Sequence, residues 1–196
     1  MSTDITFTTL LAHTSLITRV TVLNGDFQTA LSNAHSTTNS FISTHALTSH
    51  LLPTPAPITF GPNSPTDPTL RFEVGYIIKE DAASLSAVQA TLENTDFTTC
   101  GTIVGNRSEG GEELVEGVGL RVTEEGEWAV RIYEGNLKDA GSVWGQFIGD
   151  TMGLMEKEGF EADHGRCFAE RYISGLEGVR EEDVRVQLLI PIKRRV

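Results

Sequence analysis

Apolar and polar positions follow the same order of patterns twice along the chain. Residues 15–23 (SLITRVTVL) and 127–133 (EWAVRIY) are apolar or alternating, which predicts strands, and a glycine follows each of them. Residues 26–47 and 140–155 have apolar positions at helical spacing, so each strand is expected to lead into a helix. Further strands are predicted after each helix, around 57–60 and 71–79 and around 167–173 and 184–193, and before each unit, at 5–11 and 118–122.

The two units align with each other at a nearly constant spacing. At an offset of 110 residues Val20, Gly25 and Ala30 fall on Val130, Gly135 and Ala140, and 71–79 falls on 185–193 at an offset of 114. We therefore predict one α+β domain over 1–196, made of tandem strand–helix–strand–strand repeats at about 5–80 and about 114–196. Its antiparallel sheets are expected to carry helices on one side. Residues 81–113 form an insertion with a short helix over 82–94, an apolar piece and a loop rich in glycine and glutamate.

One predicted strand carries a carboxylate where an apolar side chain is expected. In RCFAERYISG (166–175), Phe168, Glu170 and Tyr172 share one face because strand side chains alternate. A glutamate between two aromatic rings needs a partner. Two readings stay open: a ligand or a water molecule held against the carboxylate, or an arginine at the sheet surface, for which the candidates are Arg171, Arg185 and Arg131.

The charge of the chain narrows the choice of partners. The formal net charge is −12, with −2 in residues 1–70 and −10 in the remainder. This balance opposes direct binding to nucleic acid or to an anionic membrane surface and suits cationic or neutral ligands. Apolar residues make up 39% of the chain, without a membrane-spanning run or a signal peptide, so we expect a folded cytoplasmic protein with two reduced cysteines.

The spacing of residues in the sequence does not indicate a metal-binding or cofactor-binding site. The five histidines are scattered, a nucleophile elbow is absent, and the glycines of 105–112 lack the lysine of a phosphate-binding loop. We therefore expect no metal and no cofactor.

Several of these segments together resemble the GyrI-like (gyrase-inhibitor-like) domains. The resemblance is carried by WAVRIYEGNLKDAGSVWGQF (128–147), ERYISG (170–175) and VRVQLLIPIK (184–193). It implies a central ligand cleft between the repeats, lined with aromatic rings and containing a buried glutamate, that binds bulky lipophilic or cationic compounds. GyrI-like domains also serve as effector-binding domains of multidrug-sensing activators, and some stand-alone members are thought to hydrolyse cyclopropane-bearing toxins.

Carried over residue by residue, the resemblance assigns the glutamate position to Glu170, the tyrosine to Tyr172 and the helix tryptophan to Trp144. The predicted ligand-binding residues are Trp144, Phe168, Tyr172, Phe147 and Tyr76, each of which also fits a place in the core. Tyr133 is a candidate hydroxyl donor, so the predicted catalytic pair is Glu170 and Tyr133.

Three functions are consistent with these residues. The leading prediction is a stand-alone binding protein that captures lipophilic or cationic small molecules and so serves detoxification. The alternative is a hydrolase that opens strained cyclopropane rings with Glu170 as general acid or base. The third is an inhibitor of a protein partner such as gyrase. The sequence is also compatible with a homodimer.

Overall fold

The computed structural model describes residues 4–23, 27–53, 58–61, 70–95, 112–136, 139–173 and 184–195. Its helices are α1 (Phe27–Thr44), the 3-10 helix η1 (Leu47–His50), α2 (Ala82–Glu93) and α3 (Ala140–Glu158). Its strands are β1 (Thr6–Leu10), β2 (His13–Leu23), β3 (Ile58–Phe60), β4 (Leu70–Ile77), β5 (Glu112–Thr123), β6 (Gly126–Gly135), β7 (Phe160–Ala162), β8 (Ala169–Tyr172) and β9 (Val184–Arg194).

The strands form one antiparallel sheet. Read inwards from its two edges, the two halves of the sheet show equivalent strands of the two repeats in the same order. The order is β1-β6-β9-β8-β3-β4-β2-β5, with β7 attached to β9. Each half exchanges its leading strand, because β1 pairs with β6 and β5 pairs with β2. The short strands β3 and β8 pair in the middle and join the two halves. The predicted α+β fold of tandem strand–helix–strand–strand units is therefore confirmed.

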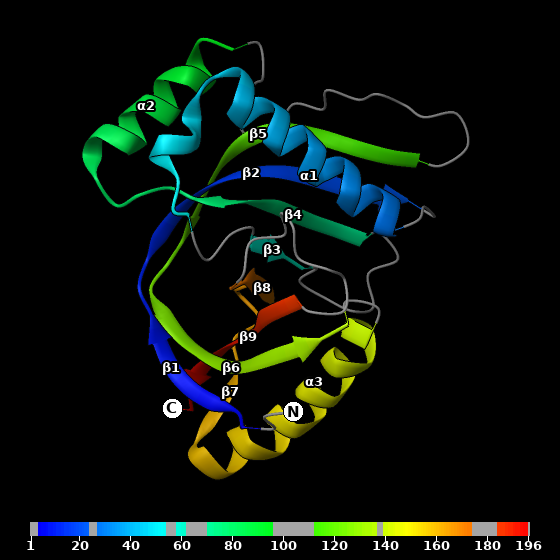
Figure 1. The fold of residues 1–196 in the computed structure, drawn as a ribbon. Helices are drawn as coiled ribbons and strands as arrows, with labels where there is room; N and C mark the ends of the chain where they lie inside the picture. Colours follow the sequence, from blue (N-terminus) through cyan, green and yellow to red (C-terminus); the bar gives the residue numbers. More distant parts are fainter. Residues whose placement is uncertain are drawn as a thin grey trace.

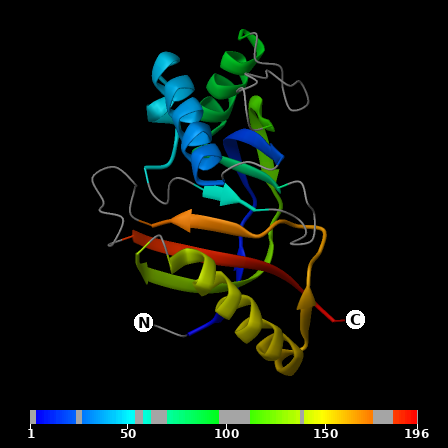
Figure 2. The same cartoon turned by 90° about the vertical axis from the view of Figure 1, so that its right-hand side faces the viewer.

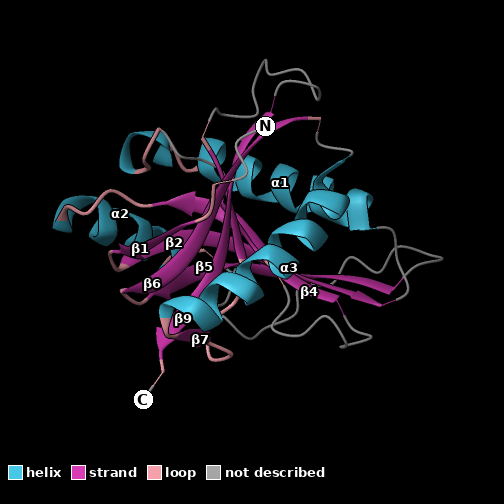
Figure 3. Cartoon of the chain, turned by 90° about the horizontal axis from the view of Figure 1, so that it is seen from below, coloured by secondary structure: helices cyan, strands magenta, loops and turns pink. Residues whose placement is uncertain are grey.

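The helices cover the outer faces of the two half-sheets. Figure 1 shows α1 and α2 beyond one half and α3 beyond the other, and Figure 2 shows the same layers from the side. Seen from below, α3 lies across the strands of its own half (Figure 3). Between the halves a shared core holds Ile17 and Ile77 from one side and Trp128, Ala169 and Leu189 from the other. We call the sheet surface that faces this shared core the inner face.

The structure corrects the alignment of the two repeats. The helices α1 and α3 begin at Phe27 and Ala140, which are 113 residues apart. The pairs Thr18–Val74 and Arg131–Leu188 hold equivalent places in the two half-sheets, and Thr18 and Arg131 are again 113 residues apart. The offset of 110 predicted for this strand was wrong by three residues. An odd shift exchanges the faces of a strand, which the few identities in the sequence could not detect.

The predicted short helix of the insertion is α2, and β7 is a strand that the sequence did not predict. The Asp81 carboxylate caps α2 by accepting a hydrogen bond from the Ser84 backbone N–H at 2.7 Å. The apolar piece and acidic loop expected at 96–111 lie outside the described residues. No described helix combines the length and apolar character that crossing a bilayer requires.

Candidate functional site

The strand β8 and the two residues before it, Cys167 and Phe168, present different side chains on their two faces. Phe168 and Tyr172 pack in the core between the sheet and α3, whereas Cys167 and Ala169 pack in the shared core on the inner face. Glu170 lies in register between Phe168 and Tyr172 and therefore faces α3, as the predicted alternation requires.

The carboxylate of Glu170 accepts hydrogen bonds from two neutral donors. The indole N–H of Trp144 on α3 donates to Oε1, and the hydroxyl of Tyr172 donates to Oε2 at 3.2 Å. The Trp144 ring stacks on Phe168, with centroids 5.9 Å apart, and meets Phe147 at 5.7 Å. The carboxylate is thus held at the edge of a small aromatic cluster.

The arginines that could have neutralised this carboxylate are engaged elsewhere. Arg131 pairs with Asp150 at 2.6 Å, and Arg185 pairs with Glu134 at 2.7 Å. Arg171 follows Glu170 directly and therefore points to the opposite face of β8. Within the described part of the chain, Glu170 forms no ion pair.

Burial shapes the acid–base properties of the site. Loss of hydration raises the pKa of Glu170, and the hydrogen bonds from Trp144 and Tyr172 oppose that rise. Burial and the neighbouring carboxylate raise the pKa of Tyr172, so its phenol stays protonated and remains a donor. Such a carboxylate can hold a cation, or can exchange a proton with a water molecule or a substrate.

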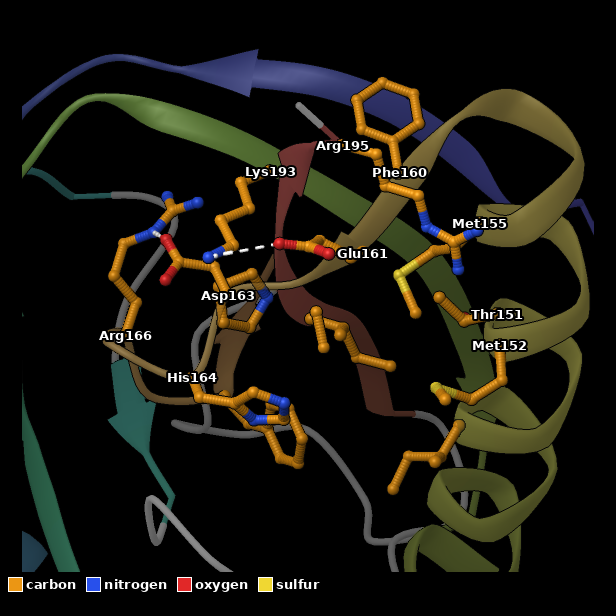
Figure 4. A pocket seen from close by; sticks show the side chains of 15 residues that line it. Thr151, Met152, Met155, Phe160, Glu161, Asp163, His164, Arg166, Lys193 and Arg195 are labelled. Atoms are coloured by element: carbon orange, nitrogen blue, oxygen red, sulfur yellow. Dashed lines mark hydrogen bonds and ion pairs between the residues drawn. The ribbon is translucent and has the colours of Figure 1, made fainter.

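A cavity of about 460 Å³ opens beside this cluster (Figure 4). Apolar side chains of α3, β7 and β9 line much of it, among them Met152, Met155, Phe160, Ile190 and Pro191. Phe168 lines the cavity and also stacks on Trp144, whose indole contacts Glu170, so these two rings connect the cavity to the Glu170 site.

Charged side chains surround the cavity in pairs. Lys193 Nζ lies 3.2 Å from Glu161, and Arg166 Nε lies 2.7 Å from Asp163. Arg166 also donates to the backbone carbonyl oxygens of Glu127 and Ile192, at 2.9 and 2.8 Å. These hydrogen bonds hold its guanidinium group in place beside the cavity. No sequence pattern predicted these charged side chains at the cavity, because their positions depend on β7 and on the turn that follows it.

Two predicted site residues lie elsewhere. Tyr133 is buried beneath α3, but its hydroxyl donates to the backbone oxygen of Asn136 at 2.7 Å and packs over Gly135 instead of reaching Glu170. Tyr76 belongs to the core beneath α1 and α2, and its hydroxyl donates to Asn39 at 2.6 Å. The structure thus groups Trp144, Phe147, Phe168 and Tyr172 around Glu170 and leaves the Tyr133 hydroxyl and Tyr76 apart from it.

Known families and curated proteins give no match to the chain by sequence. Solved structures do match its fold. EcmrR in a complex with DNA has a TM-score of 0.62 at 11% identity, covering 98% of this chain and 58% of EcmrR. A hydrolase from Listeria innocua has a TM-score of 0.54 at 17% identity, with 97% and 92% covered. SAV2435 bound to tetraphenylphosphonium has a TM-score of 0.55 at 10% identity, with 97% and 94% covered.

These likenesses define the class of fold. At 10–17% identity they concern the backbone arrangement alone. The chain has the fold of the GyrI-like effector-binding domains, as the resemblance in its sequence implied.

Proposed function

We propose that this protein binds bulky lipophilic cations, with Glu170 as the charged contact and the neighbouring aromatic cluster and cavity as the apolar contact. One observation carries the proposal: a partly buried carboxylate receives only neutral hydrogen-bond donors, and the described residues offer it no cation. A cationic ligand would supply the missing charge.

The surroundings of Glu170 favour an apolar body on that ligand. Trp144 and Phe168 present aromatic rings, and a cation near such a ring gains about 0.5–2 kcal/mol depending on its hydration. The cavity beside Phe168 has the volume of a small-molecule site. Met152 is 57% exposed at this cavity, and flexible methionine side chains adapt to ligands of different shape. SAV2435, which shares the fold, was solved with tetraphenylphosphonium, a compound of this class.

Two ions of the same shape and opposite charge test this proposal. Tetraphenylphosphonium and tetraphenylborate would be titrated into the wild type, Glu170→Gln and Glu134→Gln by isothermal calorimetry. Glu134→Gln is the matched control, because it removes the same charge from a side chain that is 66% exposed and lies in a surface ion pair.

We expect the wild type to prefer the cation. Glu170→Gln should weaken phosphonium binding about tenfold and leave borate binding unchanged or stronger, since about 1.4 kcal/mol of attraction corresponds to that factor. The control should bind as the wild type does. Equal binding of the two ions, or equal phosphonium affinity in the wild type and Glu170→Gln, would contradict the proposal.

A second function rests on the raised pKa of Glu170. In a hydrolase of strained rings, Glu170 would take a proton from water while the water oxygen bonds to a cyclopropane carbon. The ring C–C bond would break, and its electron pair would pass to a conjugated substrate oxygen that then takes up a proton. Tyr172, whose hydroxyl contacts Glu170, suits the donor role better than Tyr133. A Listeria innocua protein of this fold is described as a hydrolase.

Product analysis with a cyclopropane-bearing alkylating compound separates binding from turnover. Many ring-opened products per wild-type molecule, and none with Glu170→Gln, would establish the hydrolase. Saturable binding with unchanged compound would leave the binding function alone.

A further inference from the structure

Buried polar atoms gather on the inner face of the sheet, opposite the Glu170 site. The atoms His13 Nε2, Ser15 Oγ, Thr123 Oγ1 and Arg171 Nε are buried and find no hydrogen-bond partner in the described part of the chain. The first three are neighbours, because His13 pairs with Thr123 and Ser15 with Arg121 across β2 and β5. Buried polar atoms in folded proteins nearly always have a partner, so this group points to one that the described residues do not supply.

The same face carries arginine side chains from β2, β5 and β8. Glu73 on β4 accepts hydrogen bonds from Arg19, at 2.8 and 2.5 Å, and from Arg121, at 2.5 Å. Arg121 also donates to the Sγ of Cys167, two residues before β8, at 3.4 Å. Arg171 on β8 adds a third guanidinium group to this face, because it alternates with Glu170 along the strand.

The positive charges of two of these guanidinium groups act on His13. Burial is the main cause that lowers the pKa of His13, and the positive charges of Arg171 and Arg121 lower it further, against the opposing effects of the hydrogen bond to the Leu11 backbone oxygen and of Glu80. Arg121 lies opposite Ser15, two residues from His13, and its contact with Cys167 brings it to the segment of the other half-sheet that leads into β8 and Arg171. Arg19 and Arg121 side chains are 33% and 24% exposed, so solvent reaches this face.

We propose that the inner face binds a small oxyanion, a carboxylate or phosphate group, against Arg171 and Arg121 with Ser15 and Thr123 as further donors. A guanidinium presents its N–H groups in a fixed fork that matches two oxygens of such a group. The hydroxyls of Ser15 and Thr123 would supply additional hydrogen bonds. Because this site and Glu170 lie on opposite faces of β8, either can exist without the other.

Titration of labelled protein with acetate and with inorganic phosphate tests the site and separates the two sources of an oxyanion. The NMR signals of the Arg171 Nε–H and the His13 ring would be followed at constant ionic strength, with chloride as the reference ion. We expect a saturable shift of both signals for at least one oxyanion and a rise in the pKa of His13 at saturation. These two readouts use the wild type and do not depend on any variant folding.

Three variants assign the binding. Arg171→Gln should weaken binding at least tenfold, and Arg171→Lys should weaken it less because the charge remains without the fork. Arg194→Gln is the matched control, since Arg194 is 68% exposed and lies over Phe160 on the α3 side. The proposal is wrong if the shifts grow linearly without saturation, or if Arg171→Gln and Arg194→Gln lose affinity equally. Water would then be the partner of the buried donors.

Discussion

Glu170 and Glu73 are two carboxylates of one sheet that are held in opposite ways. Glu73, whose side chain is 8% exposed, lies between the guanidinium groups of Arg19 and Arg121 on the inner face. Glu170 lies on the outer face and receives the N–H of Trp144 and the O–H of Tyr172. Both have their hydrogen bonds, but only Glu73 also has counter-charges within the described chain.

This difference separates a structural carboxylate from one that is available for chemistry. A buried carboxylate that forms ion pairs with two arginines holds parts of the fold together, and its removal takes an ion pair from each arginine. A buried carboxylate held by neutral donors keeps an unneutralised charge, so its protonation and any bound cation remain coupled. The three predictions below test that contrast from the largest expected effect to the smallest.

The first prediction concerns stability at Glu73. Glu73→Gln should lower the free energy of unfolding by about 3 kcal/mol, because two partly buried guanidinium groups lose their carboxylate. Urea denaturation at neutral pH measures this loss. Glu170→Gln is the comparison and should cost less than about 1 kcal/mol, since the amide keeps an acceptor for Trp144 and no cation loses its partner. Equal losses in the two variants would show that the two carboxylates play the same role.

The second prediction concerns the pH dependence of stability. Both His35 and Glu170 contribute to it, so their two contributions must be measured separately. Burial lowers the pKa of His35 on α1 to about 4, from an ordinary value of 6.5. The unfolded chain therefore binds a proton that the folded protein excludes, and stability falls as the pH drops from about 6.5 to about 4. The expected loss is about 2 kcal/mol, which is less than the full shift implies because His35 is partly exposed.

Glu170 acts in the opposite direction over an overlapping range. Its pKa is raised above the ordinary 4.5, so its contribution to stability is greatest below that value and is lost as the pH rises through the folded pKa. Urea titrations of the wild type, His35→Gln and Glu170→Gln would resolve the two contributions. His35→Gln should flatten the acid side of the profile, and an unchanged slope would contradict the assignment to His35.

The position of Glu170 could be predicted from the sequence because it depends on local patterns. Alternation along β8 and the helical spacing of α3 are local patterns, and they place Phe168, Glu170 and Trp144 on facing surfaces. The glutamate was conspicuous because its neighbours on that face are aromatic. The direction of the Tyr133 hydroxyl was less accessible, since it depends on the turn after Gly135, where the backbone oxygen of Asn136 accepts its hydrogen bond.

The charged cluster on the inner face could not be predicted from local patterns. Arg19, Glu73 and Arg121 come from strands far apart in the chain, and their contact depends on the pairing of β2 with β4 and with β5. Strand register is decided by the packing of whole faces, and in this chain even the offset between the repeats was misjudged by three residues. The three-residue strand β7 carries too short a pattern to be predicted, so the cavity rim was missed with it.

The third prediction returns to the neutral donors of Glu170 and has the smallest effect on stability. Trp144→Phe keeps a ring against Phe168 but removes the N–H that the carboxylate accepts, at a cost of about 1 kcal/mol in unfolding free energy. Because that hydrogen bond lowers the pKa of Glu170, its loss should raise this pKa further. Tetraphenylphosphonium affinity, measured between about pH 4.5 and 8, should then reach its midpoint at a higher pH than in the wild type.

The matched control is Trp128→Phe, which removes an indole N–H that has no hydrogen-bond partner in the described residues. The same midpoint in the wild type and Trp144→Phe would mean that the indole does not tune the carboxylate, whereas a shift confined to Trp144→Phe would show that neutral donors hold the charge of Glu170 in place.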